Sequence, residues 1–125
     1  MKTAMDKVKE FHLAADAPVR EIPHLPPDNE RKLRMNLLAE EYNEYLTGEL
    51  NNDIEEICDA LGDMVVIICG TAHSYGIPLD KVFDEIHRSN MTKVVDGKVV
   101  RRSDGKILKP SNYEPPNLKE ILERP

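Results

Sequence analysis

Two neighbouring segments of this chain carry carboxylates at the spacing of a metal site. The acidic residues are Glu40, Glu41 and Glu44 in LLAEEYNEY, and Glu56, Asp59 and Asp63 in EEICDALGDM. Positions three or four residues apart share one face of an α-helix, so each set forms a row if both segments are helical. Sites built from carboxylates alone favour hard cations such as Mg²⁺ or Mn²⁺, which keep waters and bind substrate phosphates.

The apolar surroundings predicted for Asp63 make its ionised form unfavourable in free energy. The row that contains it continues into Val66, Ile67 and Gly70, and the other faces of the segment are also apolar. We therefore expect this face to be buried over its second half. A helix that is apolar nearly all round is central in a bundle or lies at a subunit interface.

A buried carboxylate needs a partner, and three alternatives are open for Asp63. It could be protonated and hydrogen-bonded to an Asn, Tyr or Ser side chain. It could form a buried ion pair with Arg34 or Arg88. It could also share a divalent cation with Glu41 and Glu44.

Apolar periodicity and helix punctuation predict the elements that position these groups. The expected helices span about residues 2–15, 28–47, 53–75 and 78–90, with a short helical turn at 118–123. Asp28 is expected to cap the second helix and Gly48 to end it, while Asn52 or Asp53 caps the third and Gly76 ends it. Four prolines between residues 16 and 27 exclude a helix there.

The helical apolar periodicity ends after Asn90. Residues 93–100 are two β-prone runs joined by Asp96-Gly97, the strongest short signal for a hairpin. The predicted fold is all-α: a single domain over residues 1–125, built as a four-helix bundle with a small C-terminal β-hairpin or irregular arm.

The net charge of −6 over 125 residues hides an uneven distribution. Residues 1–87 carry 8 basic and 18 acidic side chains, whereas residues 88–109 carry 7 basic and 2 acidic ones. The basic arm either neutralises the acidic body or binds phosphates. The acidic total disfavours a nucleic-acid partner.

The cysteine spacing and the lengths of the apolar runs indicate the cellular compartment of the protein. Cys58 and Cys69 lie 11 residues apart in one expected helix. That separation is about 16 Å, too far for a disulfide, as is usual in a reducing cytoplasm. The longest apolar run, residues 64–69, is too short to span a bilayer, and the N-terminus lacks the apolar core of a signal peptide. We expect a soluble cytoplasmic protein without a membrane partner.

The two segments that contain the carboxylates resemble those of a known protein family. LLAEEYNEY followed by CDALGDMVVIICGTA resembles the MazG-like all-α nucleoside triphosphate pyrophosphohydrolases, whose signature is Glu-Glu-x-x-Glu on one helix and Glu-x-x-Asp on the next. The later stretches VFDEIHRSNMTK and LKPSNYEPP are similar, more narrowly, to the dUTPase-like, Cof-like branch.

The resemblance implies a ligand set. Glu41, Glu44 and Asp63 would hold Mg²⁺, with Mn²⁺ as a possible substitute, and Glu40 would be the base that activates water. The family's fourth ligand stands three residues before the aspartate, where this chain has Ala60. Asp59 is the preferred replacement, and Glu56 is a supporting neighbour or an alternative ligand.

The implied reaction is attack of water on a nucleoside triphosphate, which yields a nucleoside monophosphate and pyrophosphate. Arg88, Lys93 and Lys106 would neutralise phosphate charge, and Asn90 would contact the sugar or phosphate. The expected assembly is a homodimer or a dimer of dimers. Two alternatives remain: a catalytically silent helical module that binds a nucleotide or a protein, and nucleic-acid binding by the basic arm.

Overall fold

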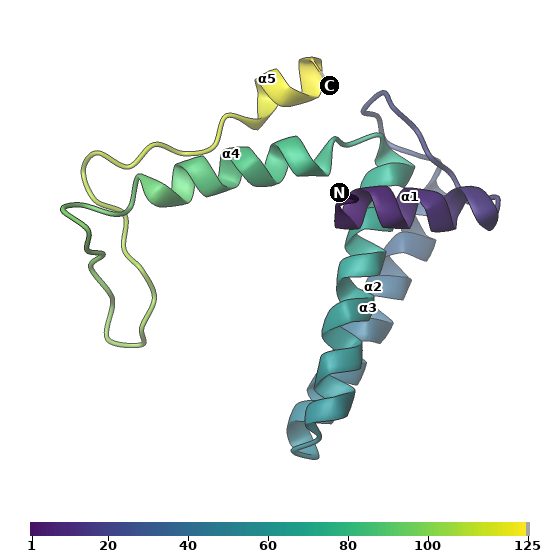
Figure 1. Ribbon diagram of the computed structural model, residues 1–125, viewed down its shortest axis with the longest axis horizontal. Coiled ribbons are helices and arrows are strands. Elements are labelled where there is room, and N and C mark those ends of the chain that lie inside the picture. The colour runs from purple at the N-terminus through teal and green to yellow at the C-terminus, as the bar shows by residue number, and fades with distance from the viewer. Residues whose placement is uncertain (125) are drawn as a thin grey trace. The chain divides into compact units, whose positions relative to one another are not determined.

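The computed structural model describes residues 1–124, and within them the fold is all-α. Five helices are present and no sheet: α1 (Ala4–Ala14), α2 (Asp28–Leu50), α3 (Ile54–Tyr75), α4 (Leu79–Met91) and α5 (Leu118–Glu123) (Figure 1). This confirms the predicted fold class. The described chain forms two compact units, residues 1–78 with α1 to α3 and residues 79–124 with α4, α5 and the basic arm.

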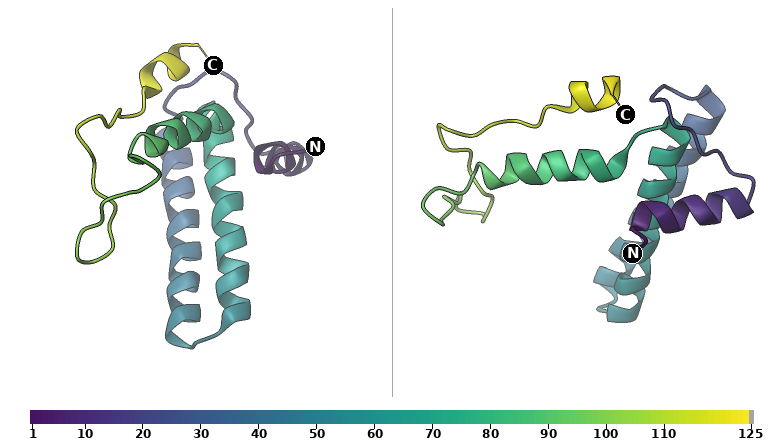
Figure 2. Two further views of the ribbon diagram at one scale, coloured as in Figure 1. Left: turned by 60° about the vertical axis from the view of Figure 1, so that its left-hand side comes forward. Right: turned by 45° about the horizontal axis from the view of Figure 1, so that its top comes forward.

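The centre of the first unit is an antiparallel pair of helices. Figure 2 shows α2 and α3 running side by side, joined by a short turn. Asp53 begins α3 as its N-cap, because its side chain accepts a hydrogen bond of 3.1 Å from the Glu56 N–H. This confirms one of the two predicted caps.

The predicted start of α2 near residue 28 agrees with the structure, but the predicted N-cap and the predicted C-terminal end are wrong. The N-cap position is Pro27, and Asp28 is already the first helical residue. There its negative charge interacts favourably with the positive end of the helix dipole. At the other end the helix continues through Gly48 to Leu50. Gly48 is helical and buried. A Cβ at this position would come within 3.0 Å of the Ile57 side chain and 3.1 Å of its backbone nitrogen. The glycine therefore permits close approach of the two helices.

The proline-rich connector closes the C-terminal end of α3. Gly76 adopts a left-handed conformation, with φ of 70°, and ends the helix as predicted. The Arg20 and His24 N–H groups donate to the His73 and Tyr75 carbonyls at 2.8 and 3.0 Å. Terminal carbonyls that the helix itself cannot satisfy are thus paired with the connector.

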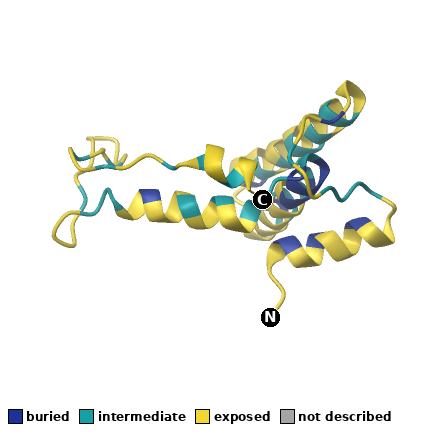
Figure 3. Cartoon of the chain, turned by 90° about the horizontal axis from the view of Figure 1, so that it is seen from above, coloured by how far each residue is buried: buried dark blue, intermediate teal, exposed yellow. Residues whose placement is uncertain are grey.

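Two buried histidines attach α1 to this unit. The His73 ring is 2.9 Å from the Met5 carbonyl oxygen, and the His12 ring is 2.9 Å from that of Pro18. Figure 3 shows buried positions along one side of α1, where Met5, Val8 and His12 lie.

The apolar surface of α3 is less covered than the sequence predicts. Leu61, Val65 and Ile68 are 50%, 48% and 42% exposed, and Val66 is exposed as well. The face for which burial was expected is buried only in part: Gly70 is buried, Asp63 and Ile67 are half-buried, and Val66 is exposed. By length and composition α3 is also apolar enough to cross a membrane, but core helices of soluble proteins pass the same test.

The arm forms turns where the hairpin was predicted. The Asp96-Gly97 turn has positive φ at both residues and closes one bridge between Val95 and Lys98. The ladder stops there because the Lys93 and Val94 N–H groups bond back to the end of α4. A second isolated bridge joins Arg101 and Ile107. The two-stranded hairpin over residues 93–100 is thus wrong, and the irregular form of the arm is the one observed.

The close approach at Gly48 predicts opposite effects for two glycine substitutions. In an open helical position, Gly→Ala stabilises by about 0.5–1 kcal/mol. Gly62 is such a position, with nothing within 4 Å of an added Cβ, so Gly62→Ala should raise the free energy of unfolding. Gly48→Ala should lower it by about 1 kcal/mol, because overpacking outweighs the helix propensity. Urea unfolding at one fixed protein concentration measures both, and equal stabilisation by the two variants would contradict the packing at Gly48.

Candidate functional site

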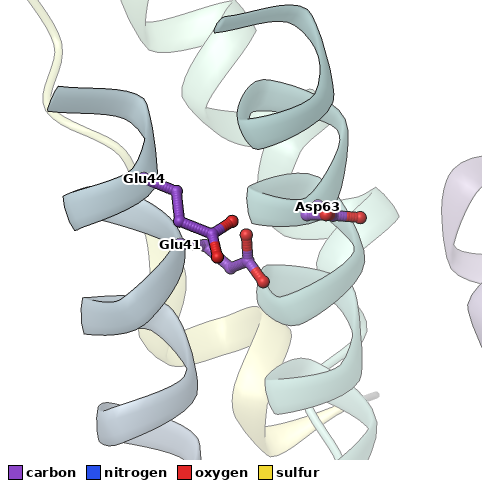
Figure 4. A group of neighbouring side chains, drawn as sticks. All are labelled: Glu41, Glu44 and Asp63. Atoms are coloured by element: carbon purple, nitrogen blue, oxygen red, sulfur yellow. The ribbon is translucent and has the colours of Figure 1, made fainter. Parts of the chain in front are cut away.

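Three of the predicted carboxylates converge between α2 and α3. Glu41, Glu44 and Asp63 each offer an oxygen atom, and these atoms all lie within 4.8 Å of one another. Figure 4 shows Glu41 and Glu44, one helical turn apart, extending from α2 toward α3, the helix that carries Asp63. We call these three residues the carboxylate group.

The electrostatics of the group are those of an uncompensated negative site. The pKa of Glu41 is raised above its ordinary value, first by burial, then by a hydrogen bond with Glu44 and by the negative charges of Glu44, Asp63 and Asp59. Its Oε2 atom is buried and has no hydrogen-bond partner among residues 1–124. A buried carboxylate oxygen without a donor is costly and calls for a proton or a cation.

Within the first unit, neither a hydrogen-bond donor nor an arginine partner is found for Asp63, and the donor set is one that a divalent cation could occupy. Within residues 1–78 no Asn, Tyr or Ser side chain donates a hydrogen bond to Asp63. Arg34 donates instead to Thr71 and to the Ile67 carbonyl. An all-oxygen donor set with one orphaned buried oxygen suits Mg²⁺ or Mn²⁺.

The other predicted residues of the first unit lie outside the carboxylate group. Glu40 is exposed, and so is Asp59, although Asp59 contributes to the raised pKa of Glu41. Glu56 is half-buried, and with Asp59 it lines an open depression at the start of α3. Ala60 is only 1% exposed, so the position where the family pattern has a carboxylate is packed inside the structure.

Sequence reasoning missed the main role of Arg34, which was considered only as an ion-pair partner. Its guanidinium bridges α2 to α3 beyond the carboxylate group, donating to Thr71 Oγ1 at 3.0 Å and to the Ile67 carbonyl at 2.9 Å. The available signal was the spacing: Arg34 precedes Glu41 by seven residues, two helical turns on the same face.

Of the residues in the second unit that were predicted to bind phosphate or sugar, Arg88 is ion-paired within the unit and the others are not. Arg88 pairs with Glu85 at 2.7 Å and with Glu114 at 3.1 Å, which joins α4 to the tail. The ammonium group of Lys93 lies 5.7 Å from the centre of the Tyr113 ring. Lys106 and Asn90 are exposed. Arg88 therefore has a structural role, whereas Lys106 and Asn90 are exposed without such pairing within residues 79–124 and Lys93 is half-buried beside Tyr113.

Glu85 is the charged anchor of the tail. Its carboxylate accepts a hydrogen bond of 2.6 Å from the Asn117 N–H as well as those from Arg88. The Arg88 guanidinium and this backbone N–H together lower the pKa of Glu85 to about 2.

The comparisons with known proteins agree with this site. Residues 8–90 match the family of phosphoribosyl-ATP pyrophosphohydrolases. The matched range includes α2, α3 and the whole carboxylate group, and it covers more than half of the chain. The chain therefore belongs to this family, an all-α, MazG-like group of metal-dependent hydrolases that act on acid anhydrides.

One curated relative is similar over a shorter stretch. It is the "Uncharacterized protein L479" of Acanthamoeba polyphaga mimivirus, which is 39% identical over 49 residues. The aligned part is 39% of this chain and 20% of that protein, so the chain spans about a fifth of the relative's length.

The raised pKa of Glu41 predicts a substitution that stabilises the protein without metal. For an acid with a raised folded-state pKa, stability falls as pH rises from the unfolded value through the folded one. Glu41→Gln removes the charge and should raise the melting temperature in EDTA at pH 7.5.

The same variant should lose the stabilisation that a bound cation provides. At Mg²⁺ concentrations 100 times the dissociation constant, the wild type should gain about 2.7 kcal/mol and Glu41→Gln almost nothing. Glu40→Gln is the matched control, since it removes the neighbouring exposed charge and should keep the Mg²⁺ effect. A normal Mg²⁺ effect in Glu41→Gln would remove Glu41 from the ligand set.

The lowered pKa of Glu85 predicts an acid-sensitive tail. The stabilisation is complete above the ordinary carboxyl pKa of about 4.5 and is lost as pH falls through about 2. The Asn117 amide should therefore stay protected from hydrogen exchange at pH 4. In Glu85→Gln, which removes the charge, this protection should be weakened at every pH above about 2. Titration of the Glu85 carboxyl by NMR near 4.5 would contradict the anchoring role.

Proposed function

We propose that this protein is a Mg²⁺-dependent nucleoside triphosphate pyrophosphohydrolase, with Mn²⁺ as a substitute, which converts a (d)NTP and water to a (d)NMP and pyrophosphate. The observation that carries the proposal is the carboxylate group with its orphaned buried oxygen at Glu41, in a chain of a pyrophosphohydrolase family. Such an enzyme could remove unwanted nucleotides from the cellular pool.

Glu41, Glu44 and Asp63 are the proposed ligands. A bound Mg²⁺ supplies neutralisation of phosphate oxygens and lowers the pKa of a coordinated water. Asp59 is the proposed further ligand, because it is close enough to affect Glu41, and Glu56 supports the site from the preceding turn. Ala60 leaves the fourth position without an oxygen of its own.

Glu40 is the proposed base. It is exposed, so its carboxylate can reach a water molecule on the solvent side of the site. It would accept a proton as that water attacks the α-phosphorus and the bond to the bridging oxygen of pyrophosphate breaks. Lys93, Lys106 and Asn90 are the proposed contacts to phosphate and sugar, and Arg88 supports them by holding the tail to α4.

The exposed apolar surface of α3 supports a dimer. Leu61, Val65 and Ile68 are exposed apolar side chains at one-turn spacing on one face of α3, as expected for an interaction surface. We propose a cytoplasmic homodimer, or a dimer of dimers, in which a second copy covers this surface. Sedimentation as a monomer at micromolar concentration would exclude it.

The experiment that tests the function is a substrate panel. The eight common NTPs and dNTPs, dUTP and phosphoribosyl-ATP are incubated with the protein and Mg²⁺ or Mn²⁺, and pyrophosphate and the monophosphate product are identified. We expect pyrophosphate from at least one of them. Asp63→Asn should reduce turnover by at least about 100-fold, since several kcal/mol of charge stabilisation is lost.

A matched variant separates metal binding from proton transfer. Glu40→Gln should reduce kcat by about 10²–10⁴-fold, the usual contribution of a general base, and leave the Mg²⁺-induced rise in melting temperature unchanged. Nucleotide binding without any turnover would favour the silent helical module instead. Unchanged kcat in Glu40→Gln would assign the base to another residue.

A further inference from the structure

Arg34 makes an unusual bridge between the two central helices. Its Nε donates to Thr71 Oγ1 at 3.0 Å, and its Nη2 donates to the Ile67 carbonyl at 2.9 Å. The Thr71 hydroxyl in turn donates to the same carbonyl at 2.8 Å. The three groups form a closed triangle that joins one side chain of α2 to two successive turns of α3.

The space for this bridge is created by Gly70. A Cβ at this position would lie 2.5 Å from Arg34 Nη2 and 2.7 Å from His12 Nε2. Because His12 is itself buried and in contact with the Pro18 carbonyl, it cannot easily retreat. The guanidinium is thus confined between α3 and α1.

The bridge fixes the register of the helices. Arg34 precedes Glu41 by seven residues on α2, and Ile67 follows Asp63 by four residues on α3. A slide of α2 by one residue would shift it about 1.5 Å along α3 and break both hydrogen bonds of the guanidinium. The same slide would separate the oxygens of the carboxylate group.

A register lock is needed because the carboxylate group repels itself. Three carboxylates with oxygens within 4.8 Å favour separation of α2 from α3. The Arg34 bridge opposes this on one side, and the tight contact of Gly48 with Ile57 opposes it on the other. Gly48 follows Glu41 by seven residues, so the two attachments lie symmetrically about the group.

We propose that Arg34 is a positioning residue: by bridging α2 to Ile67 and Thr71 of α3, it preorganises the carboxylate group for a divalent cation. Preorganisation of this kind decides affinity when ligands must be held close together against repulsion. The proposal rests on the proposed function in assuming that the group binds metal.

The test measures Mn²⁺ binding by electron paramagnetic resonance, with Mg²⁺ as competitor, so that it does not depend on turnover. Arg34→Met should weaken Mn²⁺ binding at least tenfold. Arg34→Lys should recover part of the affinity, since an ammonium can still reach one acceptor. Thr71→Val should cause a smaller loss, and adding it to Arg34→Met should cause no further loss, because the triangle is already broken.

Arg20→Met is the matched control. Arg20 is also a partly buried arginine of the first unit. It links Glu30 of α2 to the Ser74 carbonyl of α3, but Ser74 follows Asp63 by 11 residues, about three helical turns from the carboxylate group. It should destabilise the protein and leave the Mn²⁺ dissociation constant within about twofold of the wild type, at temperatures where both variants are fully folded.

The outcomes separate the two claims. Wild-type affinity in Arg34→Met, or equal losses in Arg34→Met and Arg20→Met, overturns the positioning role and leaves the metal site intact. Absence of Mn²⁺ binding in the wild type overturns the metal site and the positioning role together. If Arg34→Met does not fold, Arg34→Lys and Thr71→Val decide: normal affinity in both refutes the proposal.

Discussion

Repulsion among three carboxylates held between two helices is the constraint on which the rest of this structure depends. Glu41, Glu44 and Asp63 bring their oxygens within 4.8 Å, and an oxygen of Glu41 is buried without a donor. This grouping does not stabilise the helix pair, because each charge has unfavourable neighbours and the half-buried Glu41 and Asp63 also lose hydration. The free energy that holds α2 against α3 must come from elsewhere in the helix pair.

The attachments of the helix pair are polar and steric more than hydrophobic. The buried apolar residues are few, and several large side chains of α3 remain exposed in the single chain. The connector pairs with the last carbonyls of α3, Arg34 bridges the helices on one side of the carboxylates, and Gly48 allows close contact on the other. A subunit covering the apolar surface would add the hydrophobic contribution that one chain lacks.

Much of the fold could be predicted from local signals because those signals are local in origin. The Asp53 cap and the left-handed Gly76 obey backbone and hydrogen-bond rules that involve only a few residues. Gly48 misled the prediction because it resembles a helix stop, whereas its use is to make room for Ile57. The hairpin failed for a similar reason: the residues that would have paired were already bonded to the end of α4.

The sequence by itself determined the chemistry that is available: carboxylate rows at helical spacing, an acidic body and a basic arm. The membership of residues 8–90 in a pyrophosphohydrolase family is consistent with that chemistry. Only the tertiary structure decided which carboxylates meet, because that depends on the register between α2 and α3. It brought Glu41, Glu44 and Asp63 together, left Glu40 and Asp59 exposed, and packed Ala60 inside. It also gave Arg34 its place, since a hydrogen bond to a carbonyl in the middle of another helix has no local signature.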